Sequence, residues 1–153
     1  MSVATEKTDE QYMREALKEA EQALASRDRP VGTVIVHQDH IIARAHHQVR
    51  LLRDPTAHAT VIAITQAANA LQSDQLPEAI AYVTQEPCAM CVGALLLGGV
   101  ARVVFGATDP KAGACGSVID LTSNERLNRR LVVTREVLAG ECHMLLRKAT
   151  VNV

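Results

Sequence analysis

Hydrophobic side chains recur at three- and four-residue intervals from residue 12 to residue 24, and this spacing predicts an amphipathic helix that ends near residue 26. The residues TDEQ at positions 8–11 precede it with the pattern of a capping box, which marks the helix start. Two runs rich in β-branched residues follow, Val31–Val36 and Ile41–Ala45, and the polar residues HQDH join them. These two runs predict a β-hairpin.

Beyond the hairpin, apolar strands alternate with helical patterns. The expected elements are a helix that starts at Asp54-Pro55-Thr56 and runs to about Leu71, a strand over Ala79–Val83, a helix that opens at Cys88 and ends at Gly98-Gly99, a strand over Arg102–Phe105, a glycine-rich loop over 106–117, a strand over Leu131–Thr134 and a helix over Glu136–Lys148. This order predicts an α/β fold, with a mixed sheet that carries helices on its faces. The helix after Cys88 is apolar on nearly every side, so we expect it to be buried in the core. An interface with a partner is the alternative for this helix.

The composition limits the possible architectures and partners. A chain of 153 residues has the size of one domain, residues 1–153, and 48% of its residues are hydrophobic, which suffices for a sizeable core. The net charge of −1 provides no overall basic field for nucleic acid, and an aromatic content of 2% leaves few platforms for stacked bases. No apolar run reaches about 18 residues, so we expect no membrane span.

One histidine and two closely spaced cysteines form a candidate metal site. His58 lies in the segment DPTAHAT, and Cys88 and Cys91 lie in QEPCAMC. Two cysteines three residues apart share a face on the first turn of a helix, where the helix dipole favours the thiolate forms that bind zinc. A catalytic zinc has three protein ligands and keeps a fourth position open for water. The cofactor we predict is therefore Zn²⁺.

Other uses of the cysteines are also compatible with the sequence. The CxxC pair could be a redox pair, although Pro87 and the histidine segment favour metal binding. Cys115 and Cys142 could complete a structural site with four cysteines. A disulfide framework is not expected, because four cysteines in a chain without a recognisable signal peptide indicate a reducing cytoplasm.

From about residue 10 to about residue 147 the chain resembles the bacterial tRNA adenosine deaminases, within the cytidine-deaminase-like superfamily. The similar blocks, in the same order, are MREALKEAEQAL, PVGTVIVH, DPTAHA, YVTQEPCAMC and VVFGATDPKAGACGS. The resemblance implies a three-layer α/β/α fold with a mixed five-stranded sheet, and His58, Cys88 and Cys91 as zinc ligands. It also implies a homodimer that converts adenosine to inosine in RNA, with the tRNA anticodon loop as a candidate substrate. The H-x-E and P-C-x-x-C signature of such deaminases is well established.

Thr60 stands where the family carries the glutamate that transfers protons. A threonine hydroxyl forms hydrogen bonds but does not shuttle protons at neutral pH, so we expect this chain to be inactive or strongly impaired. Neither nearby carboxylate is expected to replace the glutamate. We interpret Asp54 as a helix-start residue and Glu86 as an acceptor that orders a loop.

The substrate side of the site departs from the family as well. His47 occupies the place of a base-contacting asparagine, so the resemblance makes His47 and Pro87 candidate substrate-binding residues. From the sequence alone, His46 and His47 are expected to be solvated loop residues. No aromatic residue follows Phe105, which weakens the case for RNA. Two alternative functions therefore stay open: a non-catalytic deaminase-fold subunit that binds RNA or a protein partner, and a deaminase of free guanine or cytosine.

Overall fold

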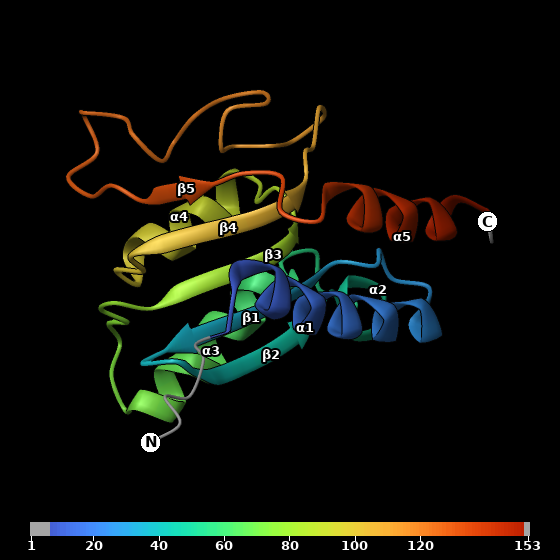
Figure 1. Cartoon of the computed structure of the whole chain (residues 1–153), viewed down its shortest axis with the longest axis horizontal. Helices are drawn as coiled ribbons and strands as arrows, with labels where there is room; N and C mark the ends of the chain where they lie inside the picture. Colours follow the sequence, from blue (N-terminus) through green and yellow to red (C-terminus); the bar gives the residue numbers. More distant parts are fainter. Residues whose placement is uncertain (1–6, 152–153) are drawn as a thin grey trace, which may run out of the picture.

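A five-stranded sheet in the order β2-β1-β3-β4-β5 forms the centre of the computed structural model, which describes residues 7–151, with side chains to residue 149 (Figure 1). The strands are β1 (Gly32–His37), β2 (His40–His46), β3 (Ile80–Gln85), β4 (Arg102–Ala107) and β5 (Val132–Thr134). β1 runs antiparallel to both β2 and β3, whereas β4 is parallel to β3 and to β5. The predicted mixed sheet of five strands is confirmed.

Helices cover both faces of this sheet. α1 (Asp9–Gln22) and α5 (Ala139–Val151) lie on one face, and α3 (Ala59–Leu71) and α4 (Ala89–Leu97) lie on the other (Figure 1). A short 3₁₀ helix, Ala23–Ser26, extends α1, and a four-residue helix, α2 (Val49–Leu52), follows β2. The three-layer α/β/α architecture is therefore confirmed.

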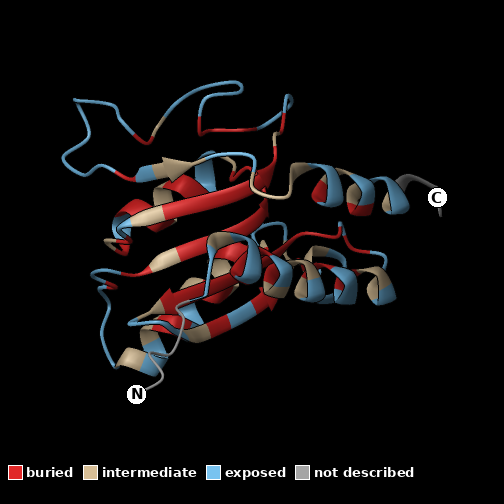
Figure 2. Ribbon diagram, in the orientation of Figure 1, coloured by how far each residue is buried: buried red, intermediate tan, exposed pale blue. Residues whose placement is uncertain are grey.

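Two apolar cores result from the alternation of side chains along the strands. In β3, Ala81 and Val83 face the core beneath α3 and α4, whereas Tyr82 faces the core beneath α1 and α5. The central strands β1, β3 and β4 are almost entirely buried (Figure 2). Since aromatic residues are so few, Val, Leu, Ile and Ala provide most of the buried volume.

The predicted hairpin closes through a two-residue turn. Gln38 and Asp39 both have positive φ values, 50° and 63°. Positive φ at both central positions is the signature of a type I′ turn, whose twist matches that of the two strands. The turn thereby fixes the register in which β1 pairs with β2.

The first turn of α1 is tied to the sheet. Thr8 and Gln11 form the predicted capping box, with hydrogen bonds of 2.8 and 3.3 Å. Asp9 accepts two hydrogen bonds of 3.0 Å from the guanidinium of Arg102 on β4 and one of 2.7 Å from the Tyr82 hydroxyl on β3. This network fixes α1 across two neighbouring strands.

Replacing Asp9 by Asn should lower the free energy of unfolding by about 1–2 kcal/mol at neutral pH, a value reduced for solvent screening of this partly exposed pair. The hydrogen-bonded Arg102 guanidinium holds the pKa of Asp9 below its usual 3.8. The contribution of Asp9 is therefore fully present above about pH 3.8 and is lost as the pH falls through the lower folded-state pKa. Urea denaturation of both proteins should show the difference shrinking in acid. A difference that stays constant with pH would contradict this account.

Two predicted helix starts are wrong, and one short helix was not predicted. The histidine helix starts at Ala59 rather than at Asp54, because the Asp54 carboxylate accepts hydrogen bonds from the backbone and hydroxyl of Thr56 and holds the segment in a turn. Asp54 is thus a turn residue and not a helix-start residue. The last helix starts at Ala139 instead of Glu136, and Glu136 and Leu138 have positive φ. The sequence patterns also missed α2.

The expectation that the helix after Cys88 is fully buried is also wrong. Cys91, Val92 and Leu95 of α4 are buried, but Leu97 is 76% exposed and Met90 is 36% exposed. One side of α4 therefore contributes to the core, and the other side presents apolar side chains at the surface.

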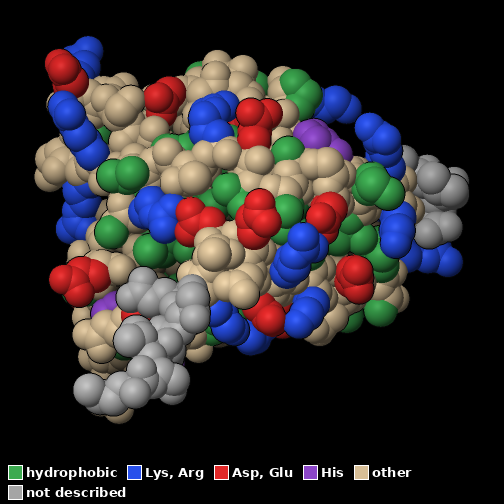
Figure 3. Space-filling model, in the orientation of Figure 1, with side chains coloured by type: hydrophobic (Ala, Val, Ile, Leu, Met, Phe, Trp, Pro, Cys, Tyr) green, Lys and Arg blue, Asp and Glu red, His purple; other side chains and the backbone are tan. Residues whose placement is uncertain are grey.

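The outer surface carries both signs of charge. On the side that displays α1 and α5, lysine and arginine side chains alternate with aspartate and glutamate (Figure 3). No helix within residues 7–151 combines the length and the apolar character that crossing a membrane requires.

Candidate metal centre and its pocket

The N-termini of α3 and α4 meet at one pocket. His58 stands at the N-cap of α3 with an extended backbone, φ −73° and ψ 147°. Cys88 stands at the N-cap of α4, and Cys91 follows in the first turn of that helix. The first N–H groups of a helix lack intrahelical partners and carry partial positive charge, so the start of α4 favours thiolate sulfur.

The three predicted ligands lie at distances that suit a zinc ion. His58 Nδ1 is 3.6 Å from Cys88 Sγ and 3.5 Å from Cys91 Sγ, and the three ligand atoms all lie within 4.8 Å of one another. Zinc bonds of about 2.3 Å to sulfur and about 2.0 Å to nitrogen, at tetrahedral angles, place the sulfur and nitrogen atoms roughly 3.5–3.6 Å apart. The residues present therefore fit a tetrahedral ion that leaves one position free.

Protons are shared unequally between the two thiols. Hydrogen bonds from Cys91 and then from His58 lower the pKa of Cys88 to about 3. The same Cys88–Cys91 bond and burial raise the pKa of Cys91. One sulfur is thus a thiolate at neutral pH and the other keeps its proton, so metal binding should release a proton from Cys91.

The pocket extends from the three ligands to the end of β3 and the loop after β4. Its lining residues are Arg29, Val31, His47, His58, Thr60, Val83, Gln85, Glu86, Pro87, Cys88, Cys91, Asp109 and Ala112. The predicted site residues His47, Thr60 and Pro87 are all among them. The structure thus brings every residue of the predicted site to one cavity.

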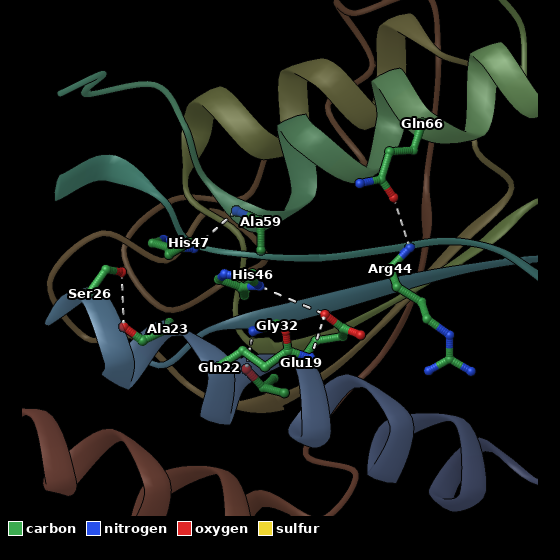
Figure 4. A network of polar contacts seen from close by, with 11 residues as sticks. Glu19, Gln22, Ala23, Ser26, Gly32, Arg44, His46, His47, Ala59 and Gln66 are labelled. Carbon is green, nitrogen blue, oxygen red and sulfur yellow. Dashed lines mark hydrogen bonds and ion pairs between the residues drawn. The ribbon is translucent and has the colours of Figure 1, made fainter. Parts of the chain in front are cut away.

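His47 is a buried, oriented residue, which corrects the expectation of a solvated loop. It is 9% exposed, and its ring stacks on His58 with 4.5 Å between the ring centroids. Its Nδ1 accepts a hydrogen bond of 3.0 Å from the backbone N–H of Ala59 (Figure 4). Burial, followed by the nearby His58, lowers the pKa of His47 to about 3. The ring is therefore neutral, and its proton lies on Nε2 as a hydrogen-bond donor.

His46 also differs from the solvated residue that we expected. Its Nδ1 lies 3.7 Å from Glu19 Oε2 on α1 (Figure 4), and its side chain is only 19% exposed. His46 and His47 are neighbours on an extended segment and point to opposite sides of the sheet. Only His47 belongs to the pocket.

Thr60 occupies the second position of α3 and is 2% exposed. Its Oγ1 lies 3.0 Å from Oγ1 of Thr33, a fully buried residue of β1, and either oxygen could be the donor. The hydroxyl of Thr60 is therefore held by an uncharged partner. A threonine pair supplies no group that accepts or releases a proton near neutral pH.

Glu86 and Asp109 are the only carboxylates among the described residues that line the pocket. Both accept hydrogen bonds from backbone N–H groups of the loop after β4. Glu86 accepts hydrogen bonds from Asp109 N, Cys115 N, Ser117 N and Ser117 Oγ. A Cβ at Gly113 would overlap this carboxylate, so the loop needs glycine there. Asp109 accepts from Lys111 N and Ala112 N. The role of Glu86 as a loop-ordering acceptor agrees with the prediction.

The other two cysteines lie apart from the three candidate metal ligands. Cys115 and Cys142 are buried free thiols, and neither belongs to the histidine–cysteine group found among the described residues. The alternative of a structural site with four cysteines is therefore wrong. All four cysteines are unpaired.

Sequence patterns missed three polar residues of the pocket, Gln85, Asp109 and Arg29. Gln85 is the last residue of β3, and its side chain lies on the same face as Ala81 and Val83. A polar residue at the end of this apolar alternation could have marked the position in the sequence. Asp109 lies in a loop, where no periodic pattern marks it. Arg29 lines the mouth of the pocket just before β1 and was likewise not singled out.

Comparison with known proteins identifies the family. Residues 7–141 match the model of the MafB19-like deaminases. A tRNA-specific adenosine deaminase from Bacillus subtilis (strain 168) is 44% identical over 138 residues, which cover 90% of this chain and 86% of that protein. A structure from a study of A-to-I editing by tRNA:A34 deaminases at the wobble position matches with a TM-score of 0.85 and 36% identity, covering 88% of this chain and 98% of the other.

A guanine deaminase from Bacillus subtilis is also similar in structure. Its X-ray structure matches with a TM-score of 0.64 and 36% identity, and the match covers 67% of this chain and 66% of the other. The predicted family and enzyme class are confirmed by these relatives. The chain belongs to the MafB19-like deaminases, an enzyme family in which its relatives include tRNA-specific adenosine deaminases.

Proposed function

We propose that residues 1–153 form a single zinc-dependent nucleobase deaminase domain, most similar in activity to the enzymes that convert adenosine to inosine in tRNA, with turnover strongly impaired by Thr60. The observation that carries this proposal is the group His58, Cys88 and Cys91 beside a threonine that is bonded only to another threonine. The first feature supports metal-assisted hydrolysis. The second removes the expected proton carrier.

His58, Cys88 and Cys91 would hold the zinc ion. When bound, zinc supplies the Lewis acidity that makes a water molecule nucleophilic at neutral pH. Deamination also needs protons delivered to a ring nitrogen and to the departing amine. Thr60 can donate a hydrogen bond at this place, but it cannot transfer those protons. His47 would orient the base through its Nε2–H, and Pro87 would form part of the pocket wall.

The relatives support RNA as the substrate, since the proteins matched over most of this chain are tRNA-specific adenosine deaminases. Arg29, an exposed cation at the pocket mouth, could contact a phosphate beside the target nucleotide. The net charge of −1 means that such contacts would be local.

A non-catalytic role is the second candidate. It is favoured by the hydroxyl at position 60 and by the use of both Glu86 oxygens in holding the loop, which leaves that carboxylate no free oxygen for proton transfer. In that role the metal would stabilise the two helix ends, and the pocket would bind a base without converting it. Deamination of free guanine is a third candidate, supported by the structural similarity to a guanine deaminase.

We also propose a cytoplasmic homodimer. The exposed side of α4 adjoins an apolar surface formed by Gly93, Leu96, Leu97, Leu121 and Leu127. A second copy of the chain would bury these side chains, as expected for an apolar patch of this kind. Four unpaired cysteines suit a reducing compartment.

A single-turnover assay with excess protein tests the proposed activity. We expect slow formation of inosine in an anticodon stem–loop RNA that carries adenosine at the wobble position, and no conversion of free guanine or cytosine. Mass spectrometry of the RNA and release of ammonia are the two readouts. Faster conversion of guanine than of RNA would favour the free-base alternative. Robust multiple turnover on the RNA would contradict the impairment assigned to Thr60.

A further inference from the structure

Gln85 is a buried polar side chain that the account of the metal centre does not use. It is 7% exposed and lines the same pocket as Thr60 and His58. Its neighbour in sequence, Glu86, makes several hydrogen bonds, yet the Gln85 side chain has no hydrogen-bond partner among the described residues. Among the described residues, no fully buried side-chain nitrogen or oxygen lacks a hydrogen-bond partner, so the unpartnered amide of Gln85 is accessible from the pocket. Gln85 therefore has hydrogen-bonding capacity directed to the pocket rather than to the protein.

The position of Gln85 in the sheet argues against a packing role. Side chains two residues apart on a strand share a face, so Ala81, Val83 and Gln85 form one row on the face beneath α3 and α4. Ala81 and Val83 are apolar and belong to the core. An apolar residue at position 85 would extend this row, so packing alone does not require an amide there. The row thus turns polar at the point where it reaches the pocket.

A glutamine amide presents one donor group beside one acceptor. The complementary partner is an edge on which an amino group lies next to a ring nitrogen, and glutamine pairs in this way with adenine. His47 in the same pocket offers only a donor, because its Nδ1 is occupied by the Ala59 N–H. His47 therefore cannot accept from an amino group, whereas the Gln85 carbonyl can.

We propose that Gln85 recognises the amino-bearing edge of the bound base, with its carbonyl accepting from the exocyclic amine and its amide NH₂ donating to the adjacent ring nitrogen. This inference rests on the proposed function, since it assigns a specificity role within the same pocket. In this proposal Gln85 selects a base that carries an amino group beside a ring nitrogen, as adenine does.

The test uses two short single-stranded RNAs and the full-length protein as purified. One RNA carries a single central adenosine among uridines, and the other carries an abasic unit at that place, so contacts to the backbone cancel. Fluorescence anisotropy gives the affinity for each. We expect the wild type to prefer the adenosine strand, and Gln85→Met, which keeps the length of the side chain, to reduce that preference roughly tenfold or more.

Thermal stability separates recognition from a structural role. Gln85→Met should leave the melting temperature essentially unchanged, because the Gln85 amide faces the pocket and makes no hydrogen bond to the protein that the substitution would break. Gln66→Met is the matched control. Gln66 is exposed on α3 and accepts from Arg44 N at 3.0 Å (Figure 4), so its loss should lower stability slightly and leave RNA binding unchanged.

Each outcome decides between the two proposals. If the wild type prefers the adenosine strand and Gln85→Met keeps the full preference, the role of Gln85 is overturned and the proposed function stands. A Gln85→Met protein that loses stability together with binding would also overturn it, in favour of a structural role. If Gln85→Met does not fold, the near-isosteric Gln85→Glu, which removes the donor, takes the same test. A wild type with no preference for adenosine overturns the proposed function itself.

Discussion

Replacing Thr60 by Glu should increase the rate of deamination by at least about 10²–10⁴-fold. Thr60 lines the pocket beside His58, so a carboxyl group at this position would reach the space next to the metal ligands. It would carry protons to the base and to the leaving amine, which the threonine hydroxyl cannot do. The rate of inosine formation in an anticodon stem–loop RNA, measured for both proteins under single-turnover conditions, gives the increase directly.

Thr60→Gln is the matched control for this experiment. Glutamine has the length and shape of glutamate but cannot transfer protons, so Thr60→Gln should remain as slow as the wild type. Both substitutions deprive the Thr33 hydroxyl of its partner at 3.0 Å, and each should cost about 1 kcal/mol of stability. Only the carboxylate should restore turnover. A Thr60→Glu protein that binds zinc but still forms no inosine, guanine-derived product or ammonia would instead support the non-catalytic role.

Removing one metal ligand should abolish zinc binding. We expect about one zinc per wild-type chain and essentially none in His58→Ala or Cys88→Ala, because two remaining ligands do not hold a structural or catalytic zinc. The apparent melting temperature should fall in both variants, since a bound zinc ion would link the starts of α3 and α4 in the folded state only. Elemental analysis of gel-filtered protein and thermal denaturation measure the two effects.

Cys142→Ala provides the control for the ligand variants. Cys142 is buried and free, but it lies on α5 and packs into the core on the opposite face of the sheet from the candidate metal ligands. This variant should keep its zinc and lose only the stability expected for a small cavity. Wild-type protein without zinc, or ligand variants that retain it, would contradict the assignment of the metal centre.

Much of the fold could be predicted from local patterns. The hydrophobic spacing over residues 12–24, the TDEQ capping box and the hairpin turn at Gln38 and Asp39 depend on neighbouring residues only, and each was found where the pattern placed it. The spacing of Cys88 and Cys91 and the blocks shared with the deaminases likewise pointed to the three residues that the structure brings together. Boundaries were less accurate where side chains compete with the helix, as Asp54 does through its bonds to Thr56.

By itself, then, the sequence determined the order of elements, the family and the trio of candidate ligands, because periodicity and motif spacing are properties of the chain. Only the tertiary structure decided the state of the polar residues around them. The partners of Thr60, His47 and Glu86 come from segments distant in sequence or from backbone groups whose direction depends on the fold. The tertiary structure likewise decided that the Gln85 side chain has no partner among the described residues and that one side of α4 is exposed. Burial and hydrogen bonding depend on which elements meet in space.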